Sequence, residues 1–456
     1  MTVRIDVCDS QGRQLHRPGD DVRVSLREPA HRASLAPEVT DLGNGSYLAH
    51  IPLLWPGRPE VHAQLSYNIE FIRAFHRIRN SVKSVKHLMG EFSDGKISEA
   101  TLCLHFPGLP YYSKVCDLSH LNGGVAWYCG HPRTPGLTCE HWKTIRDLRF
   151  LQKLPLTKAE QEFNKISFGD IPSRIILNVQ AKGNKSGMSP RLGREDENKR
   201  SWETRAPRGY FFNRVWRPLD DVKGSSVKVQ HVTGRLSTRQ LQQCLANTSI
   251  FLNGDSNLRI AYFIIGKRIG CDVKPRPKWH RPLSCFVNES NTSLFWQIHA
   301  LPFHGGGTTW CNTSDYTHVA DTLDQIPKEG NFVVMINLNL HYTYDHHSTF
   351  LSHIQTTRAA MERVLERNPK VKLVVRGPHQ AMLKWLPIQG GDLMRRLFEA
   401  HIRREFAKLQ DKVYFLSPWD MTVAARSGDF HPFDFVNQEI AEVFLDFVCF
   451  DHKLDT

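Results

Sequence analysis

Phe251-Leu252-Asn253-Gly254-Asp255-Ser256-Asn257-Leu258-Arg259 is the stretch of this 456-residue chain that decides the fold of its C-terminal half. It starts inside a short apolar run, 248–253, which predicts a buried strand, and it leads into a helical segment over 257–268. Gly254 allows the chain to turn sharply between the two. This order places the Ser256 hydroxyl at the carboxyl end of a strand and near the free N–H groups of a helix N-terminus.

The alternation of strand and helix continues to the end of the chain. Further apolar runs predict strands over 294–301, 332–340, 371–376 and 413–416. Apolar residues with a 3.6-residue period predict helices over 349–368, 392–409 and 435–447. Such alternation is typical of an α/β domain with a parallel sheet covered on both faces, which binds ligands at the carboxyl ends of its strands.

The first 70 residues indicate β-structure instead. Alternating segments at 2–7, 21–27, 46–53 and 61–66 are separated by glycine- and proline-containing turns, as in an immunoglobulin-like sandwich. Four strands are few for a complete sandwich, so we expect an opening strand to be missing. A helix is expected over 67–87.

The middle of the chain differs again in composition. Residues 95–145 hold four of the ten cysteines with Gly, Pro and Trp, which predicts a disulfide-stapled, loop-rich insert. No Cys-x-x-Cys pair occurs, so zinc-knuckle and thioredoxin-like sites are not favoured. Lys182–Arg208 predicts an exposed loop or linker. The expected domains are therefore 1–70, 71–208 and 209–456.

Cysteine number and glycosylation signals bear on the compartment. An even cysteine count and six Asn-x-Ser/Thr triplets favour an oxidising, glycosylating compartment, secreted or in the Golgi lumen. The candidate acceptors are Asn44, Asn184, Asn247, Asn288, Asn291 and Asn312. The N-terminus has no apolar core of signal-peptide type, so a truncated start is expected. The alternative is a cytosolic protein with ten free thiols. No apolar run is long enough for a transmembrane segment.

The net charge of +13 favours anionic partners without choosing among acidic glycans, nucleic acid and membrane surfaces. The basic segment 182–208 lacks the aromatic residues typical of single-strand binding, so nucleic acid is not expected.

Two motifs together indicate nucleophilic catalysis. Ser256 has the position of a nucleophile beside an oxyanion-stabilising helix N-terminus, although Asp255 or Ser256 as a simple helix cap is the alternative. A base and an orienting acid are available in Ser427-Gly428-Asp429-Phe430-His431-Pro432, a loop that follows the last expected strand. The alternative is that Asp429 and His431 are ordinary surface residues. Both motifs are expected at the same edge of the sheet.

These motifs resemble a known family. Gly254-Asp255-Ser256, Arg259 and Asp429-Phe430-His431-Pro432 resemble a PC-esterase domain, a branch of the SGNH (GDSL-like) hydrolase fold. The flanking motifs resemble the neurexophilin and PC-esterase (NXPE) family: Tyr210-Phe211-Phe212, Trp216-Arg217-Pro218, Trp419-Asp420-Met421-Thr422, Asn437-Gln438 and Cys449. Asp41–Tyr47 is similar to a turn of the filamin-type, neurexophilin-like sandwich. The resemblance covers essentially the whole chain.

The resemblance implies acyl-ester chemistry on carbohydrate. PC-esterase relatives add or remove acetyl groups on sugar hydroxyls, including those of plant wall polysaccharides and sialic acids. If the roles of the PC-esterase residues are carried over to this chain, Ser256 is the nucleophile and His431 is the general base and then the general acid. Asp429 is then the group that orients the imidazole. The partner is then a glycan or glycoprotein. No bound cofactor is implied, although an O-acetyltransferase needs an acyl donor such as acetyl-CoA, whereas an O-acetylesterase uses water.

Several positions depart from the SGNH pattern. Many SGNH enzymes place the Asp three residues before the His, where this chain has Gly428. The usual oxyanion glycine after the second strand is replaced by Ala300, whose backbone N–H is the candidate donor. His304-Gly305-Gly306-Gly307 resembles lipase oxyanion loops, but those precede the serine. Asn339 is the candidate oxyanion amide.

Two further residues have alternatives. Arg259 binds an anionic or acyl group or else forms a salt bridge, and His341 lines the pocket or is a satisfied, half-buried histidine. His341, Asp345, His346 and His347 lack a distant partner motif, so no metal site is predicted.

The second functional hypothesis is a catalytically inactive, secreted binding or signalling protein. Its working surface is then the neurexophilin-like N-terminal domain. The oligomeric state is not predicted.

Overall fold

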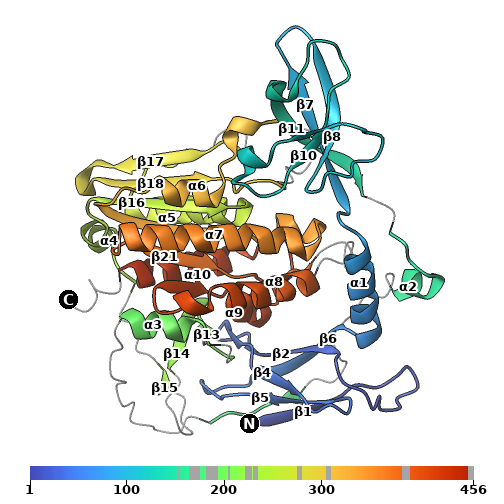
Figure 1. Ribbon diagram of the computed structural model, residues 1–456. Helices are drawn as coiled ribbons and strands as arrows, with labels where there is room; N and C mark the ends of the chain where they lie inside the picture. The colour runs from blue at the N-terminus through green and yellow to red at the C-terminus, as the bar shows by residue number, and fades with distance from the viewer. Residues whose placement is uncertain are drawn as a thin grey trace.

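The computed structural model describes residues 1–151, 154–163, 175–180, 194–203, 206–220, 228–229, 235–274, 280–303, 310–382 and 391–449. Within these residues the strands form four sheets, and helices cover the central one (Figure 1).

The central sheet has six strands and carries the candidate site. Their order is β17 (Leu283–Val287), β18 (Thr292–Gln297), β16 (Thr248–Gly254), β20 (Asn331–Asn337), β21 (Lys372–Arg376) and β22 (Val413–Leu416). The strands from β18 to β22 are parallel, as expected. β17 was not predicted and pairs antiparallel with β18, so the sheet is mixed.

Helices lie on both faces of this sheet because its strands are apolar on both sides. In β20, Val333 and Met335 belong to the core shared with α5 (Ser256–Ile269) and α10 (Asp434–Val448). Val334 and Ile336 belong to the opposite core. The helices of that second core are α1 (Ile69–Ser81), α6 (Val319–Asp324), α7 (His347–Arg367) and α8 (Asp392–Glu405).

Two antiparallel sheets form the N-terminal part and share one apolar core. The smaller has the order β1 (Thr2–Asp6), β5 (Ser46–His50), β4 (Glu38–Asp41). The larger has the order β12 (Ile175–Ile176), β6 (Glu60–Tyr67), β2 (Asp21–Glu28), β3 (Ala33–Leu35), β13 (Gly209–Phe212), β14 (Val215–Asp220), β15 (Lys228–Val229).

The larger sheet crosses the domain boundary expected at residue 209. β13 pairs antiparallel with β3 through Phe211 and Ser34, and β14 follows β13 in the same sheet. Without β13, the edge of β3 would leave backbone hydrogen-bonding groups unpaired. Residues 209–220 therefore belong to the N-terminal sheet rather than to the central one.

The cysteine-rich segment contributes to a third antiparallel sheet, and its short strands leave most of residues 95–145 in loops and turns, in agreement with the expected loop-rich insert. The sheet contains β7 (Lys86–Ser93), β8 (Ser98–Leu104), β9 (Val115–Asp117), β10 (Tyr128–Gly130), β11 (Trp142–Leu151) and β19 (Cys311–Asn312). It projects at the top of Figure 1. Disulfides Cys103–Cys129 and Cys116–Cys139 link its strands and turns, as a stapled insert requires.

The segment expected as an exposed loop contains a packed helix. α3 (Arg194–Ser201) lies against β22, where Ser201 Oγ accepts a hydrogen bond from Phe415 N at 2.8 Å. Trp202 Nε1 donates to Val413 O at 2.7 Å. The prediction was wrong here because a mainly charged helix is anchored by only a few buried residues. Residues 182–193 and 204–205 lie outside the described residues.

Three further α-helices are α2 (Lys158–Phe163), α4 (Thr238–Cys244) and α9 (Trp419–Ala425). Disulfides also join Cys244 to Cys449 and Cys271 to Cys285, whereas Cys8 and Cys311 are not disulfide-bonded. Four disulfides are compatible with the secretory pathway. Among the described helices, none has the length and hydropathy needed to cross a bilayer.

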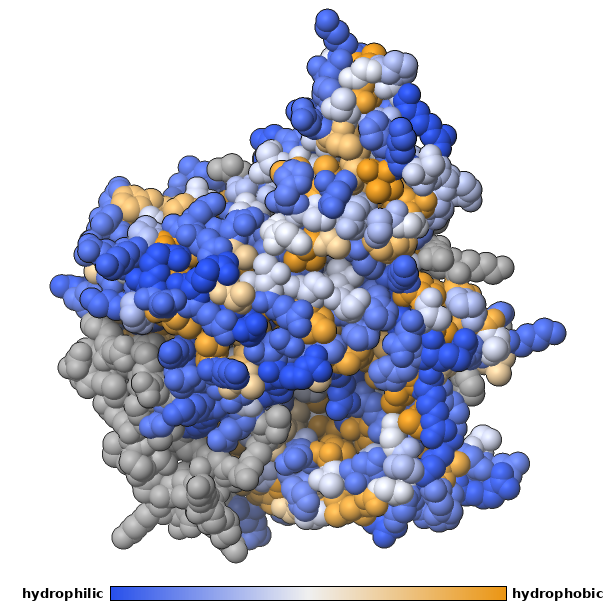
Figure 2. All heavy atoms as spheres, viewed as in Figure 1, coloured by the Kyte–Doolittle hydropathy of each residue, from blue (hydrophilic) through white to orange (hydrophobic). Residues whose placement is uncertain are grey.

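The molecular surface shown in Figure 2 is mainly hydrophilic, with scattered apolar patches. The described sequon asparagines are all exposed: Asn44, Asn247, Asn288, Asn291 and Asn312. Asn184 lies outside the described residues. Asn247 and Asn291 immediately precede the parallel strands β16 and β18, so they lie at the sheet edge opposite Ser256. Glycosylation there stays a prediction, and it would leave the edge with Ser256 open.

Candidate active site

Ser256 is the first residue of α5, directly after the turn that ends β16. The Asp255 carboxylate caps the helix, since its Oδ1 accepts a hydrogen bond from Asn257 N at 2.8 Å. The capping alternative therefore applies to Asp255, and the Ser256 side chain remains available for another partner. Close packing between β16 and β20 requires glycine at position 254, because a Cβ there would lie 2.8 Å from Asn337 O.

The Ser256 hydroxyl meets an imidazole from the far end of the chain. Its Oγ lies 2.7 Å from Nε2 of His431, 175 residues away in sequence. His431 is exposed and Ser256 is half-buried, so a ligand can approach both from solvent. Two contacts hold the turn that follows His431: Ser427 Oγ accepts from Phe433 N at 2.9 Å, and Asn437 Nδ2 donates to Pro432 O at 2.7 Å.

Asp429 does not join this pair. Its exposed carboxylate accepts a hydrogen bond from Phe430 N at 2.7 Å. Within the described part of the chain, no hydrogen bond or ion pair connects it to His431. The structure therefore shows a serine–histidine pair, and the carboxylate two residues away is hydrogen-bonded to the backbone N–H of Phe430.

His379, which the sequence analysis did not single out, supports the loop of His431. Its Nε2 lies 2.9 Å from the carbonyl oxygen of Phe430, so this nitrogen donates. Burial lowers the pKa of His379 well below its usual value, and Arg395 and Arg376 lower it further, so the imidazole is neutral. Its own carbonyl accepts from Arg395 Nη1 at 2.8 Å. A signal was present in the sequence, because His379 closely follows the fourth expected strand.

Arg23 of β2 connects the N-terminal sheet to the segment that carries His379. Its Nη1 donates to Gln380 Oε1 at 2.9 Å and to Asp392 Oδ2 at 2.6 Å, and its Nη2 donates to Asp21 at 2.6 Å. Arg23 and both carboxylates are almost fully buried. This network fixes the segment that carries His379 against the N-terminal sheet.

Behind Ser256 lies a buried polar layer at the ends of β16, β20 and β21. Asn337 Nδ2 donates to Asp255 Oδ1 at 3.2 Å. Asn339 Nδ2 donates to Asn337 Oδ1 at 2.7 Å and to Arg376 O at 3.1 Å. Both amide hydrogens of Asn339 are therefore engaged, which leaves none for the expected oxyanion role. Burial lowers the pKa of Arg376 to about 10, partly offset by Asp255.

Ala300 and His341 lie at the same edge of the sheet as Ser256, beyond the ends of β18 and β20. Both are buried. The His341 ring packs against Phe303 with 4.3 Å between centroids, which favours the packed-histidine alternative. His304–Gly307 lies outside the described residues.

Arg259 lies one helical turn after Ser256 and is half-buried. Its guanidinium stands over the rings of Phe263 and Trp296, at 5.1 and 5.9 Å from their centroids. Burial lowers its pKa. The salt-bridge alternative is not observed within the described residues, so an anionic or acyl ligand stays the prediction for Arg259.

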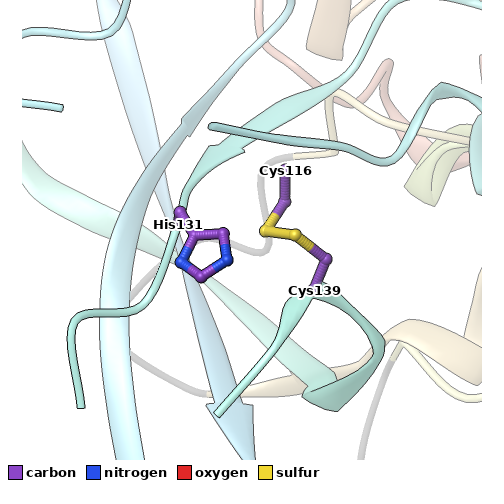
Figure 3. Close-up of side chains that lie close together, drawn as sticks. All are labelled: Cys116, His131 and Cys139. Carbon is purple, nitrogen blue, oxygen red and sulfur yellow. A yellow bond between two sulfur atoms is a disulfide. The ribbon is translucent and has the colours of Figure 1, made fainter. Parts of the chain in front are cut away.

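Among the described residues, the side chains of Cys116, His131 and Cys139 in the cysteine-rich segment lie close enough together to be considered as a metal site. Figure 3 shows that the two sulfur atoms are bonded to each other beside the imidazole. Sulfurs in a disulfide are not thiolates, so this group does not offer a metal site in the oxidised chain. No described contact gathers the histidines around His341 into a metal site.

One solved structure that this chain resembles is an active-site mutant of a family two carbohydrate esterase from Clostridium thermocellum in complex with celluohexase. The identity is 12%, the alignment covers 82% of this chain and 90% of that chain, and the TM-score is 0.28. At that TM-score the likeness is too weak to bear on fold or chemistry. Residues 225–449 match the family model "NXPE family member 4-like, C-terminal domain". Residues 225–449, which contain both Ser256 and His431, are therefore a C-terminal domain of the NXPE family.

Proposed function

We propose that this protein is a carbohydrate O-acyltransferase or O-acylesterase that works through an acyl-serine intermediate. The observation that carries the proposal is the 2.7 Å contact between Ser256 Oγ and His431 Nε2 at the carboxyl edge of the sheet. A nucleophile–base pair within hydrogen-bond reach is the signature of covalent acyl transfer. The carbohydrate substrate rests on the similarity of the flanking motifs to PC-esterase domains.

In the first step His431 acts as general base. Its unprotonated Nε2 takes the Ser256 proton while Oγ attacks the acyl carbonyl carbon. The tetrahedral intermediate collapses when the C–O bond to the leaving alcohol breaks, and His431 returns the proton to that alcohol. The products of this step are the acyl-serine and a free hydroxyl compound.

The second step separates the two activities. Water or a sugar hydroxyl gives its proton to His431 and attacks the acyl carbon, and Ser256 recovers the proton when its bond to the acyl group breaks. Water makes the protein an esterase. A sugar hydroxyl makes it a transferase. With a thioester donor such as acetyl-CoA, the bond that breaks in the first step is the C–S bond, and His431 returns the proton to the leaving thiol.

The oxyanion needs donors that are fixed before the reaction. The N–H of Ser256 belongs to the first turn of α5 and has no acceptor within the helix. We propose it as one donor and the backbone N–H of Ala300 as the second. Because Asp429 does not contact His431, the pair works as a dyad, or Asp429 turns toward the ring when ligand binds.

Labelling with a serine-reactive fluorophosphonate tests the nucleophile. Ser256→Ala should abolish labelling, and His431→Ala should slow it by roughly 10³-fold. Ser352→Ala, which changes an exposed serine of α7, is the matched control and should label normally. Unchanged labelling of Ser256→Ala would remove Ser256 from the mechanism.

A second candidate is a secreted binding or signalling protein with an inactive esterase-like domain. The observation that favours it is the Asp429 carboxylate, which accepts from the backbone N–H of Phe430 rather than from His431. Four disulfides and exposed sequons support secretion in either case. Absence of labelling in the wild-type protein, together with a normal fold, would support this candidate.

A further inference from the structure

The disulfide Cys116–Cys139 of the cysteine-rich sheet has an imidazole beside it. The side chain of His131 lies next to the S–S bond, with one ring nitrogen within 4.8 Å of both sulfur atoms (Figure 3). In the pairing of β9 with β10, Cys116 is opposite Cys129. His131 extends the same ladder, because its N donates to Lys114 O at 3.0 Å. Alternate residues of a strand point to the same face, so the register places His131 diagonally across from Cys116.

The hydrogen bonding of His131 leaves one ring nitrogen available for chemistry. Nδ1 lies 2.8 Å from the carbonyl oxygen of Pro132, which can only accept, so Nδ1 carries the proton of the neutral ring. The lone pair of the neutral ring is then on Nε2. At such a nitrogen an imidazole acts as a base and, once protonated, as an acid. The same backbone contact fixes the orientation of the ring beside the disulfide.

The two sulfur atoms differ in their access to solvent. Cys116 is 1% exposed in β9, whereas Cys139 is half-buried and begins a short 3₁₀ turn, η2 (Cys139–His141). Thr138 and Glu140, on either side of Cys139, are exposed. A thiol from solvent therefore reaches the Cys139 sulfur first, and the buried Cys116 sulfur is the leaving group. A thiolate in buried, apolar surroundings is unfavourable, so a proton donor beside it assists the exchange.

Two other disulfides have similar exposure without the imidazole. Cys244–Cys449 and Cys271–Cys285 each join one half-buried and one buried cysteine. Among the described residues, neither has a histidine or carboxylate within 4.8 Å of both of its sulfur atoms. Cys103–Cys129 is buried at both ends. The chain therefore contains its own references for the effect of the imidazole.

We propose that Cys139 is a site of reversible modification by a small-molecule thiol such as glutathione, with His131 as the acid–base group. His131 Nε2 takes the proton of the incoming thiol, and the thiolate sulfur attacks Cys139 Sγ. The S–S bond breaks, its electron pair leaves on Cys116 Sγ, and His131 gives the proton to that sulfur. The products are a mixed disulfide on Cys139 and a Cys116 thiol. The reverse exchange, in which the Cys116 thiol attacks Cys139 Sγ, restores the original bond and releases the small thiol.

This site is separate from the acyl chemistry proposed for Ser256. The bond that opens staples η2 to β9, within the sheet that projects from the rest of the molecule (Figure 1). Opening it frees the turn that carries Cys139 without touching the Ser256–His431 pair. The inference therefore goes beyond the proposed function and is tested without it.

Thiol exchange followed by peptide mass spectrometry tests the site. Reactive thiols of the full chain are blocked with N-ethylmaleimide, the excess is removed, reduced glutathione is added at neutral pH, and samples are quenched at intervals with deuterated N-ethylmaleimide. We expect Cys116–Cys139 to open at least about tenfold faster than Cys244–Cys449 and Cys271–Cys285. Glutathione should be found on Cys139 and the deuterated label on Cys116. Equal opening rates of the three disulfides, or glutathione on Cys116, overturn the proposal.

The variant His131→Gln isolates the role of the imidazole. Its amide can still donate to Pro132 O, but it cannot take the proton of a thiol. Opening of Cys116–Cys139 should therefore fall to the rate of the other two half-buried disulfides. His120→Gln, which changes an exposed histidine of the same segment, is the matched control and should open like the wild type.

Circular dichroism and the number of intact disulfides before glutathione is added show whether each variant has folded. An unchanged opening rate in a folded His131→Gln variant removes the imidazole from the reaction and overturns the proposal. The comparison of the three disulfides in the wild-type chain needs no variant, so the proposal stays testable if His131→Gln does not fold.

Discussion

The Nε2 atom of His379 lies 2.9 Å from the carbonyl oxygen of Phe430, the residue directly before His431. The Asp429 carboxylate accepts from Phe430 N, within the loop itself, whereas the contact of His379 comes from another segment of the chain and restrains the position of the His431 loop. It makes His379 a positioning residue for the proposed mechanism.

His379→Phe keeps the buried ring but removes the N–H donor. The Phe430 carbonyl then loses its partner and the His431 loop can shift, so labelling of Ser256 by a fluorophosphonate should slow by roughly 10–100-fold. His379→Gln restores an N–H donor of similar reach and should recover most of the rate. Equal labelling rates of the Phe variant and wild type, with unchanged circular dichroism, would show that His379 does not position His431.

The buried ion pair between Arg23 and Asp392 should matter for stability. Asp392→Asn leaves the buried Arg23 guanidinium with one carboxylate fewer, and breaking a buried pair costs about 3–5 kcal/mol. The free energy of unfolding in urea is the measurement. Asp6→Asn, in the exposed pair with Arg4, is the matched control and should cost at most about 1 kcal/mol. Similar losses for both would contradict the role of burial.

Acid should destabilise the fold through the buried pair His318–His353. His318 Nδ1 accepts from Ala320 N at 3.1 Å, and its Nε2 lies 3.1 Å from His353 Nδ1. These contacts require both imidazole rings to be in the neutral form. Burial lowers the pKa of His318 to about 4 from 6.5, with a smaller contribution from His299. The unfolded chain therefore takes up the proton first, and stability is lost as the pH falls from 6.5 toward 4.

Proton uptake by His318 in the unfolded chain should by itself lower the free energy of unfolding by about 1 kcal/mol at pH 5.5. The control variant is His318→Asn, which keeps a helix-capping side chain but does not titrate. Urea unfolding of both proteins at pH 7.5 and 5.5 measures the difference. A stability difference between them that does not change with pH would rule out His318 as the titrating group.

Gly254→Ala should damage both stability and the site. The added Cβ would lie 2.8 Å from Asn337 O and 2.9 Å from Leu258 Cδ1, so β16 and β20 must separate. We expect a loss of about 1–3 kcal/mol in urea unfolding and slower labelling of the adjacent Ser256. Gly108→Ala, where the nearest atom is 4.0 Å away, is the control and should be neutral. Wild-type stability of Gly254→Ala would contradict the close approach of the two strands.

Local signals in the sequence predict much of the central sheet. Five of its strands and α5, α7 and α10 match the expected segments within a few residues, because buried strands and amphipathic helices have clear apolar patterns. β17 and α3 were missed for the opposite reason. β17 alternates exposed and buried residues at the sheet edge, and α3 is mainly charged, so neither has a strong apolar pattern.

What the sequence by itself determined is the strand–turn–helix around Ser256, since the apolar run, Gly254 and the cap at Asp255 are all encoded within nine residues. Only the tertiary structure decided that His431 meets Ser256, that Asp429 does not meet His431, and that His379 supports the loop between them. These contacts join residues far apart in the chain, or depend on a side-chain rotamer, and local propensity carries no information about either. The packing of β13 beside β3 and of α9 on that sheet then sets which residues surround the pair.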